Sequence, residues 1–200
     1  MSKPISTNIH IGLKIGGRPF KQKEQIQNMV LSALLLAIGL VLPFLTGQIP
    51  EIGSALLPMH IPVLICGFIC GWQWGLIVGL IMPLLRFLLF GFPPIYPNGI
   101  AMTFELATYG AVSGLLYSFF KKKTIGIYLS LITAMLVGRV VWGMVRVVLL
   151  GFSDTEVFTW AIFVADAFIN AIPGIVLQIV LIPLLIMSIN KITSYEKEFQ

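Results

Sequence analysis

The chain has 200 residues, of which 58% are hydrophobic and only 10% are charged, and its mean hydropathy is +0.97. A soluble domain carries roughly a quarter charged residues, so this composition excludes a water-soluble fold and predicts a membrane protein. The net charge of +5 does not indicate nucleic-acid binding, because most basic residues lie at the ends of apolar segments, where they report topology.

Apolar segments separated by short polar stretches predict six membrane-spanning helices. A helix needs about 20 apolar residues to cross a bilayer. The predicted spans are residues 27–45, 59–72, 74–90, 98–120, 124–150 and 158–190. The expected fold class is therefore an all-α membrane protein with one six-helix bundle. Its domains are a basic leader over residues 1–25, a transmembrane domain over 26–190 and a tail over 191–200.

Local signals set the ends of these helices. The stretch of residues 46–58 is rich in Gly and Pro and too long for a tight turn. The second span is short for a full crossing. Three prolines within residues 93–97 predict a helix break after the third span, and Pro173 and Pro183 predict kinks in the last one.

The basic residues predict the orientation, because Lys and Arg accumulate in cytoplasmic loops. Basic clusters precede the first span, follow the fourth and follow the sixth, and six spans place all of them on one side. The opposite loops contain Glu51, Asp154 and Glu156 but no Lys or Arg. We therefore expect both termini to lie in the cytoplasm.

Ionisable residues inside the spans predict a binding site. Arg86, Arg139, Arg146, Glu105 and Asp166 lie in apolar segments, where such side chains normally face the bundle interior or a wet cavity. In the predicted orientation they gather in the outer half of the bundle. With the polar and aromatic residues nearby, the predicted substrate-binding residues are His60, Arg86, Glu105, Tyr109, Arg139, Trp142, Asp166 and Asn170.

Two interpretations of this set remain open. The three arginines could simply pair with Glu105 and Asp166 and lock the helices together. Alternatively, three cations against two carboxylates leave one positive charge that an anionic ligand could neutralise.

The chain shows no motif for nucleotide hydrolysis, metal binding or nucleophilic catalysis, so we expect neither an enzyme nor a cofactor. Cys66 and Cys70 share a helix face, but no His or carboxylate lies close enough in sequence to complete a metal site, which makes them packing residues. Ala33 and Ala37 form a small-xxx-small pattern that lets another helix approach closely, so they are the predicted partner contacts.

Over residues 28–190 the chain resembles the substrate-binding S components of energy-coupling factor (ECF) vitamin transporters. The resemblance rests on the six-span layout, the Ala33–Ala37 motif and the long stretch that follows the first span. It also rests on the runs at residues 56–62, 67–79, 85–97 and 101–105.

The resemblance implies a subunit that captures a vitamin from outside, with the first outer loop as a lid. It implies that Ala33 and Ala37 meet a transmembrane coupling subunit driven by two cytoplasmic ATPases, and that the loaded subunit topples in the bilayer. Pantothenate is the favoured substrate because the excess of buried cations suits a monoanion. A pyrimidine or pyridoxine-like precursor, a stand-alone secondary transporter and a scaffold without a ligand are the alternatives.

Overall fold

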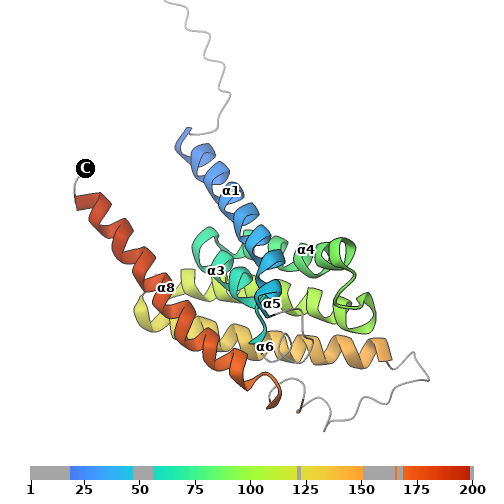
Figure 1. Ribbon diagram of the computed structural model, residues 1–200. Helices are drawn as coiled ribbons and strands as arrows, with labels where there is room; N and C mark the ends of the chain where they lie inside the picture. The colour runs from blue at the N-terminus through green and yellow to red at the C-terminus, as the bar shows by residue number, and fades with distance from the viewer. Residues whose placement is uncertain (1–18, 47–55, 121–122, 151–164, 166–168, 199–200) are drawn as a thin grey trace, which may run out of the picture.

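A computed structural model describes residues 19–46, 56–120, 123–150, 165 and 169–198, and within these ranges the chain is helical and contains no strand. Figure 1 shows the arrangement of the helices. They are α1 (Pro19–Val41), η1 (Leu42–Thr46), α3 (His60–Cys70), α4 (Trp72–Phe90), η2 (Ile95–Gly99), α5 (Ile100–Phe119), α6 (Thr124–Leu150) and α8 (Ile172–Glu198).

Five of the described helices are long and apolar enough to cross a membrane, and α3, with 11 residues, is shorter. The prediction of an all-α fold with a short second helix is therefore confirmed, and the apolar helices are compatible with a multi-pass membrane bundle. The interruption at η2 falls on the predicted break, where Tyr96 leaves the helical conformation.

The ends of the first and last helices differ from the prediction. α1 begins at Pro19 and so includes part of the predicted leader, and α8 continues to Glu198 through most of the predicted tail. The described part of the last span begins at Ile172, so Pro173 lies in the first turn of α8, where its missing N–H costs no hydrogen bond, and does not act there as an internal kink. The remainder of that predicted span lies mostly outside the described residues.

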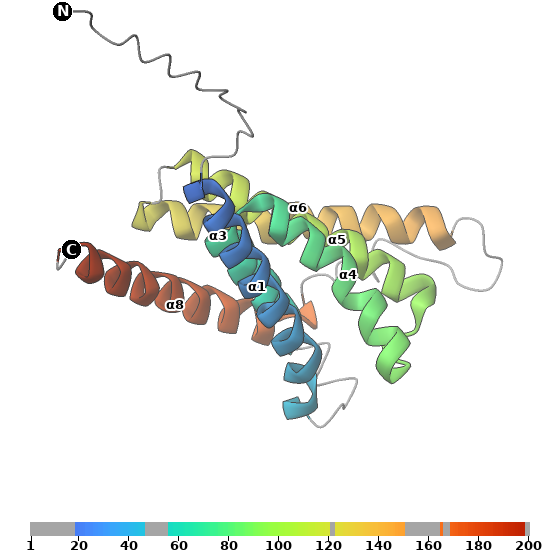
Figure 2. The ribbon, with the colours of Figure 1, turned by 90° about the horizontal axis from the view of Figure 1, so that it is seen from above.

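The short helix α3 lies at the centre of the bundle. It packs against α1, α4, α5 and α8, and all of its side chains except Ile69 are buried. Its sequence is apolar all round, which is typical of a helix enclosed by others. Figures 1 and 2 show α4, α5 and α6 as a row of neighbouring helices that α1 and α8 cross.

Glycines bring the backbones of α3, α4 and α5 into direct contact. A Cβ atom added to Gly75 of α4 would lie 2.6 Å from the carbonyl oxygen of Gly110 of α5, closer than real Cβ contacts occur. Gly67 of α3 and Gly114 of α5 are equally crowded by neighbouring backbone. Such close approach is how membrane helices gain packing energy without a hydrophobic driving force.

Helix α1 has two different faces. Ser32, Leu35 and Gly39 are buried, and the Ser32 hydroxyl lies 3.4 Å from the Cys66 sulfur of α3. Ala33 and Ala37 are exposed, on a side of α1 that the rest of the described chain leaves uncovered. Cys66 and Cys70 are free, buried thiols within the packed interior.

Candidate substrate-binding site

Glu105 is the centre of a cluster of three ionisable side chains, each from a different helix. One carboxylate oxygen of Glu105, on α5, lies 3.0 Å from the Nη1 atom of Arg139, on α6. The same oxygen lies 3.6 Å from Nε2 of His60, the first residue of α3. Glu105 and His60 are each 1% exposed and Arg139 is 5% exposed, so the cluster is enclosed by protein.

Tyr109 extends this cluster by one helical turn along α5. Its ring packs edge-on against the His60 ring, with centroids 5.2 Å apart and an interplanar angle of 63°. Gly138 of α6 makes room for it, because a Cβ atom on Gly138 would overlap the Tyr109 ring. The sequence analysis did not identify Gly138, although its place next to Arg139 is a usable signal.

The chemistry of the cluster suits a polar ligand. Glu105 and Arg139 compensate each other's charge, which a buried ionic group requires. Among the described residues, neither ring nitrogen of His60 has a hydrogen-bond partner. An imidazole can donate or accept, a carboxylate accepts and a guanidinium donates in a planar fork, so together they can recognise hydroxyl, amide or carboxylate groups.

The same face of α6 carries two further large side chains. Trp142 and Arg146 follow Arg139 at helical spacings of three and seven residues and are both buried. The guanidinium of Arg146 lies over the Trp142 ring, 4.9 Å from its centroid. The structure thus brings Trp142 onto the same buried stripe as Arg139, toward the end of α6 that is outer in the predicted orientation.

Arg86 is buried but lies in a different environment. Its Nη1 donates a 2.8 Å hydrogen bond to the carbonyl of Leu40, one of the last carbonyl groups of α1. Its guanidinium carbon lies 5.7 Å from the Phe44 ring centroid and 5.6 Å from that of Phe90. We call this arrangement the Arg86 clamp. It places a cation at the negative end of the α1 dipole and ties α1 to α4.

Replacing Arg86 by Met is expected to lower the free energy of unfolding by about 1.5–3 kcal/mol, the usual contribution of a hydrogen bond to a charged group. Arg86→Lys should recover only part of this loss, because an ammonium lacks the planar, weakly hydrated surface that a guanidinium offers to aromatic rings. Thermal unfolding of the detergent-solubilised protein measures both. The matched control is Leu88→Met, an exposed position of α4, and equal midpoints for Arg86→Met and this control would contradict a stabilising clamp.

The structure does not bring Asn170 into the buried cluster. Asn170 is exposed and lies in the turn before α8, where its backbone N–H donates to the carbonyl of Ala165 at 2.9 Å. Asp166 lies outside the described residues.

Among the buried polar residues that were not predicted from the sequence, Gln178 has the largest side chain. Gln178 of α8 is fully buried and, among the described residues, neither of its amide atoms has a hydrogen-bond partner. It is the only polar side chain between residues 172 and 187, and this isolation in an apolar run is a signal that could have identified it.

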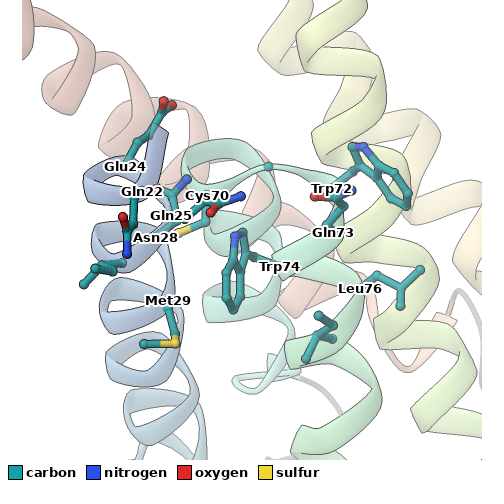
Figure 3. A pocket seen from close by; sticks show the side chains of 13 residues that line it. Gln22, Glu24, Gln25, Asn28, Met29, Cys70, Trp72, Gln73, Trp74 and Leu76 are labelled. Carbon is teal, nitrogen blue, oxygen red and sulfur yellow. The ribbon is translucent and has the colours of Figure 1, made fainter. Parts of the chain in front are cut away.

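A separate groove of about 820 Å³ lies at the other end of α3 from His60 (Figure 3). The first turns of α1 line one side, and the α3–α4 junction, with Cys70 and Trp74, lines the other. None of the predicted substrate-binding residues lines it, and Glu24, its one charged lining residue, is exposed. The groove therefore lacks the buried charges that make the Glu105 cluster the better candidate.

Comparison with known proteins agrees with this architecture. The family model described as "ECF transporter, substrate-specific component" matches residues 27–186, which is most of the chain. No curated protein and no solved structure matches it. Because the match covers all six described apolar helices in whole or in large part, the chain belongs to the family of substrate-specific components of ECF transporters.

Proposed function

We propose that this subunit captures a small anionic vitamin or precursor, with pantothenate favoured, from outside the bacterial cell membrane. A transmembrane coupling subunit and two cytoplasmic ATPases then drive its delivery inward. The observation that carries this proposal is the buried cluster of Glu105, Arg139, His60 and Tyr109 inside a multi-pass membrane bundle. Ionisable groups at such positions are costly, and they mark solute sites more often than structural ones.

The preference for an anion rests on the charges of the buried side chains. Among the described residues, the site has Arg139 and Arg146 of α6 and the single carboxylate of Glu105, whereas Arg86 is engaged in the clamp. The net charge of these buried groups is positive, and a planar guanidinium can donate two parallel hydrogen bonds to a carboxylate. Pantothenate offers one carboxylate together with an amide and hydroxyl groups. A pyrimidine or pyridoxine-like ligand is the second candidate, because Glu105 can accept hydrogen bonds from ring nitrogens and hydroxyls.

In the proposed orientation both termini are cytoplasmic, and His60 and Glu105 lie at the helix ends that face outside. Asp166 and Asn170 then belong to the segment leading into α8 at the outer mouth, where we propose that they contact the incoming solute. Trp142 contributes a flat apolar surface beside Arg139. Arg86 acts through the clamp, by fixing α1 and the start of the first outer loop, which we propose to be the lid.

The exposed side of α1 is the proposed surface for the coupling subunit. Ala33 and Ala37 lie there beside the exposed apolar side chains of Leu34 and Ile38. Small residues four apart allow a partner helix to approach within close packing distance. This surface is separate from the Glu105 cluster, so docking and solute binding can be tested independently.

Vesicles test the proposal with radiolabelled pantothenate. The purified chain alone should bind pantothenate saturably, whereas ATP-dependent uptake should require the coupling subunit and both ATPases from the same cell. Uptake by the chain alone that a protonophore abolishes would indicate a stand-alone secondary transporter. Absence of saturable binding to any vitamin precursor would indicate a scaffold.

Within this assay, Ala33→Trp is expected to reduce uptake to background while leaving pantothenate binding unchanged, because the indole blocks helix approach at a distance from the cluster. The control is Leu136→Trp, which adds the same bulk at an exposed position of α6. Normal uptake with Ala33→Trp would remove α1 as the docking surface.

A further inference from the structure

Gln178 presents a polar group that the described protein leaves unsatisfied. Its side chain is 0% exposed, and neither Oε1 nor Nε2 has a hydrogen-bond partner among the described residues. It lies on the buried side of α8, the side that also carries Ile182 and Ile186 of the apolar core. A buried amide without partners costs free energy, so such a group in a folded protein indicates a missing water or ligand.

The position of Gln178 connects it to the Glu105 cluster. α8 packs against α3 and α6, the two helices that carry His60 and Arg139. The colour gradient in Figure 1 shows that α5 and α8 run in the same general direction. Asn190 of α8 donates a 2.8 Å hydrogen bond to the Tyr117 hydroxyl of α5. Gln178 and Glu105 each lie twelve residues before the bonded residue of their helix, about 18 Å at 1.5 Å per residue, so they lie at a comparable depth.

The side chain of His60, on the neighbouring helix, also lacks a hydrogen bond within the described chain, although its Nε2 lies 3.6 Å from the Glu105 carboxylate. Both of its ring nitrogens are buried and without a hydrogen bond among the described residues. His60 and Gln178, whose polar side-chain atoms lack hydrogen bonds in the described ranges, lie on helices that are in contact, α3 and α8. Two such groups on adjoining helices favour one shared cause, a bound molecule that supplies hydrogen bonds to both.

We propose that Gln178 is a substrate-binding residue that selects for a ligand group with one hydrogen-bond donor and one acceptor, such as a secondary amide or a hydroxyl. This inference rests on the proposed function. A carboxamide has both a donor and an acceptor end, so it can accept from an amide N–H or donate to an amide carbonyl, and it can pair with a hydroxyl through either end. Arg139 then binds the charged end of the ligand, and Gln178 binds its neutral polar part.

Gln178→Leu tests the proposal in the full-length, detergent-purified protein, with pantothenate and pyridoxine as probes. Without a probe, the variant should unfold at the same or a higher temperature, because leucine removes an unsatisfied amide and fits an apolar core. Affinity for the probe that the wild-type protein binds should fall at least about tenfold, because a site that hydrogen-bonds a ligand loses strongly when that bond is removed. Gln27→Leu, the same exchange at an exposed position of α1, should change neither property.

Any other result with Gln178→Leu contradicts the assignment of Gln178 as a substrate-binding residue. A lower unfolding temperature without a probe would show that Gln178 has a structural partner. Unchanged affinity with unchanged or raised stability would show that a trapped water, and not substrate, satisfies the amide. A wild-type protein that binds neither probe would refute the proposed function first, together with this inference, and that failure is visible before any variant is made.

Discussion

Replacement of Glu105 by Gln is expected to lower the free energy of unfolding by about 3–5 kcal/mol and to abolish pantothenate binding. This is the usual cost of removing one member of a buried ion pair while the other stays buried without its partner. Arg139 lies 3.0 Å from the Glu105 carboxylate and is 5% exposed. Water therefore cannot solvate the guanidinium that loses its partner unless the bundle opens. Thermal unfolding in detergent measures the first effect, and equilibrium binding of radiolabelled pantothenate measures the second.

A double variant separates stability from binding. With Glu105→Leu and Arg139→Leu combined, most of the lost stability should return, because an apolar pair can replace a buried ion pair at little cost. Pantothenate binding should stay absent, since both recognition groups are gone. If Glu105→Gln unfolds and binds as the wild-type protein does, the cluster is neither the site nor a stabilising element.

Replacement of Gly110 by Leu is expected to prevent α4 and α5 from packing and so to yield little folded protein. A side chain on Gly110 would overlap the backbone of Gly75 on the facing helix. Overpacking a core usually costs about 1–3 kcal/mol by moving side chains, and here the obstacle is backbone, so the cost should lie at or above this range. The fraction of monodisperse protein in size-exclusion chromatography and its unfolding temperature give the measurement.

The matched control for Gly110→Leu is Thr108→Leu, which adds comparable bulk at a partly exposed position of the same helix. This control should remain monodisperse. A Gly110→Leu variant with the yield and stability of the wild-type protein would mean that α4 and α5 do not depend on glycine contact.

Much of the fold followed from patterns along the chain. Long apolar runs predicted the spanning helices, and the short run after Pro58 predicted the short α3. The prolines near residue 95 predicted the interruption at η2. These features depend on hydrophobicity and on the missing N–H of proline, which are local properties. The role of Pro173 in the first turn of α8 was harder to predict. A proline can kink a helix or begin one, and the conformation of the preceding residues decides between the two.

The partners of the buried arginines could not be read from the same patterns. Arg86 and Arg139 both lie in apolar segments that run outward in the predicted orientation, and each is a reasonable partner for Glu105 by depth alone. In the folded chain Arg139 reaches Glu105, whereas Arg86 reaches the end of α1. Periodicity tells which face of a helix is buried, but which helix lies opposite depends on contacts between residues far apart in sequence, such as Gly75 with Gly110.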